Sequence, residues 1–120
     1  MGGHVHVAGV AGVGMSALAQ ALRWTHDRVT GSDRFFDQGQ DLPIFGALRA
    51  SGVEIVKQDG AAVDARTEAV VYSTAIEADN PDFAAAKKAG VPLRHRAEML
   101  AELARGKTVL AVAGTAGKTT

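Results

Sequence analysis

Apolar residues along this chain fall into short runs typical of strands and longer stretches with helical spacing. The short runs cover 4–8, 28–32, 53–56, 69–72, 91–93 and 108–113. Between the first two runs, apolar residues recur every three or four positions, which predicts a helix with one apolar stripe; they are Met15, Leu18, Ala19 and Leu22. Further helices are predicted over 42–50, 61–66, 80–90 and 97–103.

The alternation of these segments predicts a Rossmann-like α/β fold, with a mostly parallel sheet and helices on both of its faces. The helix over 80–90 has a clear start, because Asn80 suits the capping position and Pro81 the first helical position. Residues 34–40 are instead expected to form a loop. Its two aromatics, Phe35 and Phe36, fit either a stacking contact with a base or a place in the core or a lid.

Composition is that of an ordinary globular domain. The 120 residues suit one domain, and 47% of them are hydrophobic. The 13 basic and 13 acidic residues cancel, so the net charge favours neither nucleic acid nor an anionic membrane as a partner. The absence of cysteine excludes disulfides and thiolate metal sites. The N-terminal sequence has the pattern of neither a signal peptide nor a membrane span.

A glycine-rich turn joins the first strand to the first helix. The turn, residues 9–14, is similar to a dinucleotide-binding fingerprint, except that Ala11 stands at the middle glycine. Amides at the start of the following helix would point outward, where a diphosphate can accept hydrogen bonds from them. Asp33 follows at about the 20-residue spacing at which such folds place an acidic residue against a ribose. Asp33 therefore either contacts a ribose or only starts a turn.

Polar residues follow two later strands. Residues 73–75 come directly after the strand over 69–72, and the carboxyl ends of strands face the ligand in a doubly wound sheet. The basic cluster at 94–96 fits either a solvated surface or a ligand contact. His4 and His6 share one face of the first strand. They are expected to be packing residues rather than metal ligands, because the sequence shows no further ligand cluster.

The C-terminal residues carry a second phosphate-binding pattern. The apolar run 108–113 leads into a glycine turn and a Gly-Lys-Thr sequence, the layout of a phosphate-binding loop. The match is partial, because Val112 stands where the general pattern has its first glycine, and an ordinary glycine turn is the alternative. The predicted loop residues are Gly114, Thr115, Ala116, Gly117, Lys118, Thr119 and Thr120.

The two patterns divide the chain unequally. Residues 1–106 are expected to form one nucleotide-binding domain, and 107–120 the first strand and phosphate loop of a second. A phosphate-binding loop leads into a helix whose N-terminus faces the phosphates. Because the sequence stops before such a helix, the chain is expected to be the front part of a longer protein.

Six stretches of the sequence, taken in order, resemble those of the Mur ligases. They are Gly-Val-Ala-Gly-Val-Gly-Met-Ser at 9–16, Gly-Ser-Asp at 31–33, Tyr-Ser-Thr-Ala-Ile at 72–76, Asp-Asn-Pro at 79–81, Arg-Ala-Glu-Met-Leu at 96–100 and Gly-Thr-Ala-Gly-Lys-Thr-Thr at 114–120. The resemblance covers almost the whole chain, and the ordered set is more specific than any single motif.

The resemblance implies a three-domain cytoplasmic enzyme of peptidoglycan synthesis. Residues 1–106 would bind the UDP end of UDP-N-acetylmuramic acid, and 107–120 would begin a truncated central domain that binds ATP and Mg²⁺. In this family ATP phosphorylates the muramyl carboxylate, and an amine attacks the acyl-phosphate to give an amide, ADP and phosphate. The amine would be L-alanine or, alternatively, a recycled murein peptide. The 120 residues alone are expected to be inactive.

The resemblance also assigns roles to particular residues. The implied substrate contacts are Gly9, Val10, Ala11, Gly12, Val13 and Gly14 around the diphosphate, Ser32 and Asp33 at the uridine, and Ser73, Thr74, Ala75 and Arg96 along the groove. Lys118 would be the catalytic residue, because it would hold the β- and γ-phosphates and stabilise charge on the transferred group. Thr119 would bind Mg²⁺, and the rest of the loop 114–120 would bind ATP.

Two small residues depart from the family's pattern: Ala11 replaces a glycine, and Ala116 replaces the usual histidine. The segment 33–52 is also longer than its counterpart. A different class of function, a dinucleotide-binding dehydrogenase or sensor module, would explain residues 9–33. That alternative gives the loop at 114–120 no role.

Overall fold

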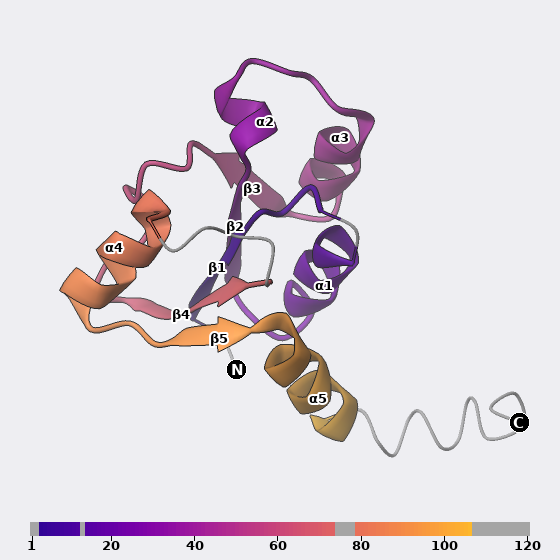
Figure 1. The fold of residues 1–120 in the computed structure, drawn as a ribbon. Helices are drawn as coiled ribbons and strands as arrows, with labels where there is room; N and C mark the ends of the chain where they lie inside the picture. The colour runs from indigo at the N-terminus through magenta and orange to yellow at the C-terminus, as the bar shows by residue number, and fades with distance from the viewer. Residues whose placement is uncertain (1–2, 13, 74–78, 107–120) are drawn as a thin grey trace, which may run out of the picture.

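The computed structural model describes residues 3–12, 14–73 and 79–106, which form an open parallel sheet covered by helices (Figure 1). Its strands are β1 (His4–Ala8), β2 (Arg28–Ser32), β3 (Val53–Val56), β4 (Thr67–Tyr72) and β5 (Leu93–His95). They lie in the order β3-β2-β1-β4-β5, and each neighbouring pair is parallel. The predicted Rossmann-like sheet is confirmed, and its strand order reverses between β1 and β4.

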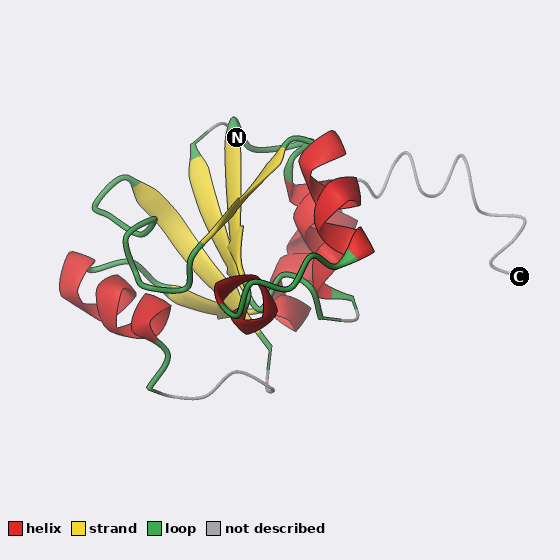
Figure 2. Cartoon of the chain, turned by 90° about the horizontal axis from the view of Figure 1, so that it is seen from above, coloured by secondary structure: helices red, strands yellow, loops and turns green. Residues whose placement is uncertain are grey.

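Helices cover both faces of this sheet, as the view from above shows (Figure 2). One face carries α1 (Met15–Leu22), α3 (Pro43–Ala50) and α5 (Arg96–Gly106). The opposite face carries α4 (Pro81–Ala89). A short helix, α2 (Arg34–Asp37), follows β2 directly. No helix within the described ranges is long and apolar enough to cross a membrane.

Alternate residues of the central strand serve two different cores. Val5 and Val7 of β1 pack with Leu18 of α1 in the larger core. Ala8 of β1 packs with Phe83 of α4 in the smaller one. The apolar stripe predicted for the first helix is confirmed, because all four of its positions are buried. Each fully buried aliphatic side chain stabilises the fold by about 1.5–3 kcal/mol, so the larger core dominates the stability.

The prediction of a loop over 34–40 was wrong for its first half, where α2 forms. The cause is Asp33, whose side chain accepts a 2.9 Å hydrogen bond from the amide of Phe35 and caps the helix. Phe35 and Phe36 are half-buried against the larger core. Phe36 meets Phe45 of α3 edge to face, with 5.7 Å between ring centroids. The structure therefore gives both aromatics a core contact.

The helix predicted over 61–66 is absent, and the segment forms two turns instead. The amide of Asp64 donates to the hydroxyl of Thr67, and the carboxylate of Asp64 accepts from the amide of Arg66 at 2.9 Å. Such local side-chain bonds offer the backbone an alternative to helical hydrogen bonds.

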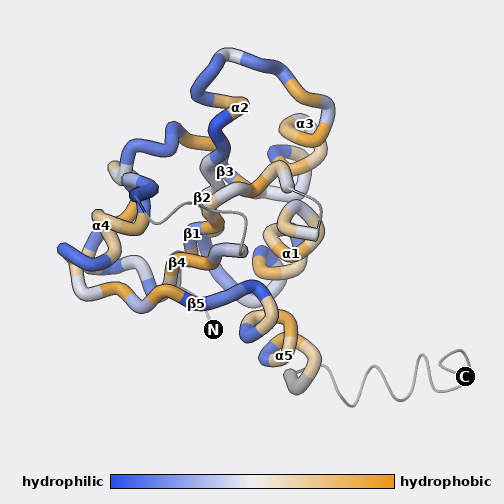
Figure 3. Tube along the Cα trace, viewed as in Figure 1, coloured by the Kyte–Doolittle hydropathy of each residue, from blue (hydrophilic) through white to orange (hydrophobic). Residues whose placement is uncertain are grey.

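Strands β4 and β5 are displaced from their predicted positions. β4 begins at Thr67, and β5 begins at Leu93 because Val91 closes α4, donating its amide to the carbonyl of Ala86 at 2.8 Å. The predicted basic cluster is therefore split between β5 and α5, and Figure 3 shows this hydrophilic edge strand beside the more apolar β4. The sixth strand and the phosphate loop, predicted over 108–120, lie outside the described residues.

Candidate functional site at the carboxyl edge of the sheet

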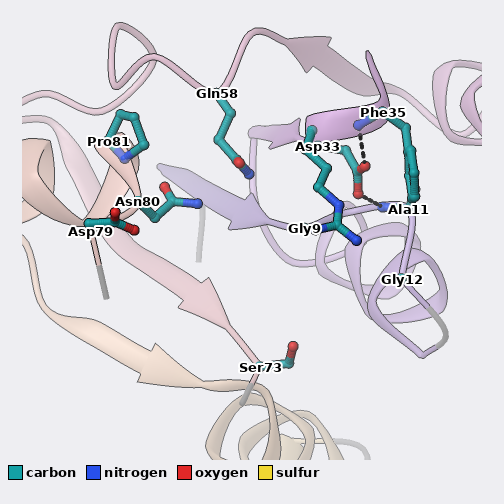
Figure 4. A pocket seen from close by; sticks show the side chains of 11 residues that line it. Gly9, Ala11, Gly12, Asp33, Phe35, Gln58, Ser73, Asp79, Asn80 and Pro81 are labelled. Atoms are coloured by element: carbon teal, nitrogen blue, oxygen red, sulfur yellow. Dashed lines mark hydrogen bonds between the residues drawn. The ribbon is translucent and has the colours of Figure 1, made fainter. Parts of the chain in front are cut away.

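A cavity of about 440 Å³ opens at the carboxyl edge of the sheet, where the strand order reverses. Its walls come from the glycine turn after β1, the junction of β2 and α2, the segment after β3, and both sides of the β4–α4 connection (Figure 4). The lining residues are Gly9, Ala11, Gly12, Asp33, Arg34, Phe35, Gln58, Ser73, Asp79, Asn80 and Pro81. Open α/β sheets bind their ligands in this kind of crevice.

The glycine turn is held in place largely by its own amides. The amides of Gly9 and Val10 both donate to the carbonyl of Ser32, at 2.8 and 2.9 Å, so the turn is tied to the end of β2. The amide of Gly12 donates to the carbonyl of Gly9 at 3.0 Å. Gly9 has a φ of 77°, a conformation that a residue with a side chain adopts only under strain.

Asp33 joins the glycine turn to α2. Its Oδ2 accepts from the amide of Ala11 at 3.0 Å, and its Oδ1 accepts from the amide of Phe35 at 2.9 Å (Figure 4). The side chain is buried but lines the cavity. A carboxylate has about four acceptor sites, so Asp33 retains the capacity to bind a ligand hydroxyl. Asp33 caps a helix where a turn was the alternative expectation, and its contact with a ribose stays a prediction.

The amides of the glycine turn are consequently poor candidates for free phosphate donors. Every amide from Gly9 to Gly12 donates to an acceptor within the protein. A diphosphate bound here would have to share or displace these hydrogen bonds. The implied amide contacts of these four residues therefore stay a prediction, and positive charge close by becomes more important.

Such charge is found where α1 begins. Gly14 caps α1 with a φ of 81°, and a helix N-terminus carries a partial positive charge. The guanidinium of Arg96 reaches this point from α5, because its Nη1 lies 3.3 Å from the place that a Cβ on Gly14 would occupy. Within the described ranges Arg96 makes no ion pair, whereas Arg94 pairs with Glu102 at 2.6 Å. This corner therefore suits an anionic group.

A cationic and an aromatic side chain form another wall of the cavity. The guanidinium carbon of Arg34 lies 5.2 Å from the ring centroid of Phe35, and both residues line the cavity. Arg34 is exposed, while Phe35 is half-buried. The arrangement is a cation–π contact, which can hold the arginine near a ligand without an acidic partner.

Beneath the cavity, Asp82 of α4 ties together three parts of the chain. Its Oδ2 accepts from the hydroxyl of Ser32 at 2.5 Å and from Nε2 of His6 at 2.8 Å. Its Oδ1 accepts from the amide of Gly60 at 3.0 Å. Ser32 in turn accepts from the side-chain amide of Gln58 at 3.1 Å. Asp82 thus fixes the segment after β3 against the ends of β2 and α4.

Two buried side chains on the α4-facing side of the sheet, Asp82 and His4, have shifted pKa values. Burial by itself would raise the pKa of Asp82, but the hydrogen bonds from His6, Ser32 and the amide of Gly60 outweigh it and lower the pKa from 3.8. Burial, assisted by the nearby charge of Arg28, lowers the pKa of His4 from 6.5. At neutral pH, Asp82 is therefore an anion and His4 is neutral.

Some of the predicted contact residues reach the cavity and others do not. Those that line it are Gly9, Ala11, Gly12, Asp33 and Ser73. Gly14 and Arg96 lie together at the start of α1. Val10 and Ser32 are fully buried, Val10 against Gly31 and Ser32 against Asp82. Val13, Thr74, Ala75 and the loop 114–120 lie outside the described residues.

Sequence reasoning assigned no site role to Gln58, Asp79 or Asn80, although all three line the cavity. A signal for Gln58 was present, because it follows the β3 strand and the carboxyl ends of parallel strands meet at the ligand edge. Asp79 and Asn80 belong to the Asp-Asn-Pro stretch, of which the helix-capping role alone was read.

The fold and the site together define a Rossmann-like α/β domain with its ligand cavity at the switch point of a parallel sheet. The model of the Mur ligase family, catalytic domain, matches residues 4–108, and the chain belongs to this family.

The sequence is also similar to individual members of the family. It is 45% identical over 118 residues to a UDP-N-acetylmuramate–L-alanine ligase of Arthrobacter sp. (strain FB24), covering 98% of this chain and 24% of that protein. It is 44% identical over 117 residues to the protein of the same name from Methylibium petroleiphilum, with the same two coverages. The chain thus spans about a quarter of the length of the curated relatives it matches.

Two crystal structures share the fold. The UDP-N-acetylmuramate-alanine ligase MurC of Thermotoga maritima aligns with a TM-score of 0.68 and 25% identity, over 88% of this chain and 23% of that one. A murein peptide ligase of Psychrobacter arcticus aligns with a TM-score of 0.69 and 25% identity, over 83% of this chain and 20% of that one.

Proposed function

We propose that this chain is the UDP-sugar-binding part of an ATP-dependent ligase that joins L-alanine to UDP-N-acetylmuramic acid in peptidoglycan synthesis. The observation that carries the proposal is the cavity at the switch point, bounded by the glycine turn and Asp33, in a member of the Mur ligase family. The names of the relatives support the choice of acceptor, since those described above are L-alanine ligases.

In this proposal the nucleotide lies across the carboxyl ends of β1, β2 and β4. The ribose approaches Asp33, whose carboxylate retains acceptor capacity. The diphosphate lies toward Gly14 and Arg96, where a helix N-terminus and a guanidinium supply positive charge. The sugar extends past Ser73, and we assign Thr74 and Ala75 to contacts with it. The glycine turn gives the ligand a close approach to the backbone.

The ATP site is proposed to begin with residues 107–120. α5 ends at Gly106, which is where the proposed boundary between the two domains falls. The loop's donor set suits a magnesium nucleotide, with an ammonium group at Lys118 for the phosphates and a hydroxyl at Thr119 for Mg²⁺. We place the protein in the cytoplasm, where ATP and UDP-sugars are available, with neither nucleic acid nor a membrane as its partner.

A second candidate within the family is a ligase that attaches a recycled murein peptide to the same UDP-sugar. Its basis is the fold shared with the murein peptide ligase, at a TM-score of 0.69. Both candidates share the nucleotide-sugar cavity described above, and they differ in the acceptor amine. The dinucleotide-binding alternative instead requires that NAD occupies this cavity.

Titration calorimetry of the 120-residue chain with UDP-N-acetylmuramic acid, UDP and NAD tests the proposal. We expect both uridine compounds to bind and NAD to give no heat of binding. The Asp41→Ala variant is a suitable control, because Asp41 is exposed and does not line the cavity. Binding of NAD more tightly than UDP would replace the proposal with the dinucleotide alternative.

A further inference from the structure

A continuous row of buried polar side chains crosses the α4-facing side of the sheet and ends beneath the cavity. The hydroxyl of Thr67 bonds to Nδ1 of His4 at 3.0 Å, and Nε2 of His4 bonds to the hydroxyl of Thr30 at 2.7 Å. Thr30 bonds to Nδ1 of His6 at 2.7 Å, and Nε2 of His6 bonds to Asp82 at 2.8 Å. All five side chains are buried.

Valence fixes the donor at the Asp82 end of this row. The carboxylate of Asp82 only accepts, so Nε2 of His6 carries a proton and donates to it. His4 is neutral, so one of its ring nitrogens donates and the other accepts, and the hydroxyls of Thr30 and Thr67 supply the complementary groups. No buried side-chain nitrogen or oxygen of the described residues is left without a partner, which agrees with this assignment.

The same reasoning fixes the side-chain amide of Gln58. The hydroxyl of Ser32 donates its proton to Asp82 at 2.5 Å, so its oxygen can only accept from Gln58. The group that faces Ser32 at 3.1 Å must therefore be the NH₂ of Gln58. The main chain of Gln58 is held as well, because its amide donates to both carboxylate oxygens of Asp37, at 3.0 and 3.2 Å.

The carbonyl oxygen of Gln58 remains for the ligand. It has no hydrogen-bond partner in the described part of the chain, and the residue lines the cavity with its side chain directed inward (Figure 4). On the neighbouring wall, Oδ1 of Asn80 accepts from the amide of Asp82 at 2.8 Å. The NH₂ of Asn80 is then the group available to a ligand. Together, Gln58 and Asn80 offer a ligand one oriented acceptor and one oriented donor.

We infer that Gln58, locked by the buried row that ends at Asp82 and Ser32, is a specificity-determining residue that accepts a hydrogen bond from the ring N–H of a uracil base. This inference rests on the proposed function, which supplies the uridine nucleotide. Uracil carries a ring N–H beside carbonyl oxygens, so it can donate to Gln58 and accept from Asn80. Cytosine has an unprotonated ring nitrogen at the same place, which would face the Gln58 oxygen with a lone pair.

The test compares UDP, CDP and UDP methylated at the ring N3, by calorimetry on the 120-residue chain and its Gln58→Leu variant. We expect wild type to prefer UDP over both analogues. In Gln58→Leu, UDP should bind about threefold to tenfold more weakly, which is the size of one neutral hydrogen bond. The ratio of the dissociation constants of CDP and UDP should fall toward one. Gln40→Leu is the matched control, because Gln40 is exposed and does not line the cavity.

The outcomes separate this inference from the proposed function. If UDP fails to bind the wild-type chain, the proposed function fails and takes the inference with it. If UDP binds but Gln58→Leu keeps the full preference for UDP over CDP, the inference is overturned while the proposed function stands. The comparison with the N3-methyl analogue uses the wild-type chain, so it does not depend on whether the variant folds. Equal binding of UDP and its methylated form to wild type would also overturn the role of Gln58.

Discussion

The carboxylate of Asp33 accepts a hydrogen bond from the amide of Ala11 at 3.0 Å and so joins the glycine turn after β1 to the end of β2. Its other oxygen caps α2 through the amide of Phe35. One side chain therefore shapes two walls of the cavity at once. This explains how Ala11 is accommodated within the glycine turn: its amide is directed to Asp33, and the residue has no positive φ.

The dual role of Asp33 leads to the first prediction. Asp33→Ala should lower the free energy of unfolding by about 1–3 kcal/mol, since it removes a helix cap and leaves the Ala11 amide without its acceptor. It should also weaken UDP binding. Urea unfolding and calorimetry on the same samples measure both effects, with Asp41→Ala as the exposed control. Unchanged UDP affinity in a folded Asp33→Ala variant would rule out a ribose contact.

A second prediction concerns the close approach of β2 to the glycine turn. A Cβ on Gly31 would lie 2.7 Å from Cγ2 of Val10, which is itself fully buried. Gly31→Ala should therefore destabilise the protein by about 1–3 kcal/mol through overpacking.

Gly46 of α3 provides the matched control, because a Cβ there meets nothing within 4 Å. Gly46→Ala should stabilise the protein by up to about 1 kcal/mol, since alanine is the better helix former. Thermal or urea unfolding of both variants checks the pair. Equal effects at the two positions would show that the contact with Val10 is unimportant.

A third prediction separates two arginines that are close in sequence. Arg96 reaches the start of α1, whereas Arg94 is paired with Glu102. Arg96→Gln should weaken UDP binding by about tenfold, or roughly 1.4 kcal/mol, and the loss should shrink as salt is added. Arg94→Gln should leave the affinity unchanged. Similar losses in the two variants would point to general surface charge instead of a diphosphate contact at Arg96.

The fourth prediction follows from the lowered pKa of Asp82. A carboxyl group whose pKa is lower in the folded protein stabilises it above the unfolded value, here 3.8, and this stabilisation is lost as the pH falls further. Urea unfolding of wild type should show this loss below about pH 4. Asp82→Asn should be less stable at neutral pH by about 1–3 kcal/mol, because an amide cannot accept from all three of its donors. The free energy of unfolding of Asp82→Asn should change less with pH in acid than that of wild type. An equal pH dependence in the two proteins would show that Asp82 does not cause the loss.

The fifth prediction concerns His4, whose pKa is lowered from 6.5 by burial. The unfolded chain then binds a proton more readily than the folded one, so stability should fall as the pH drops below about 6.5. His4→Gln retains a donor toward Thr30 but does not titrate. The variant should lose less stability than wild type between pH 6.5 and 5 in the same urea series. If the free energy of unfolding fell equally with pH in both proteins, His4 would be excluded as the cause of the fall.

Much of the fold was predictable because it depends on local patterns. The apolar stripe of α1, the Asn80 cap and Pro81 start of α4, and the parallel β1 and β2 strands follow from spacing and capping rules that act over a few residues. The errors occurred where side chains redirect the backbone. Asp33 turned an expected loop into α2, and Asp64 with Thr67 replaced an expected helix with turns.

The candidate site was predictable only in part. Strand ends and glycine turns placed Gly9, Gly12, Asp33 and Ser73 at the correct edge of the sheet. Ser32 was expected at the uridine, but its hydroxyl is committed to Asp82, a residue 50 positions away in the sequence. No short-range pattern reveals which of two neighbouring polar residues faces the core and which faces the cavity.

The sequence by itself determined the alternation of strands with helices, the position of the glycine turn and the family of the protein, because periodicity, capping and motif spacing are properties of neighbouring residues. The tertiary structure decided which polar groups remain available to a ligand. Asp82 brings His6, Ser32 and Gly60 together, and it thereby leaves the carbonyl of Gln58 facing the cavity. That outcome depends on hydrogen bonds between distant segments, which form only when the sheet and α4 are packed together.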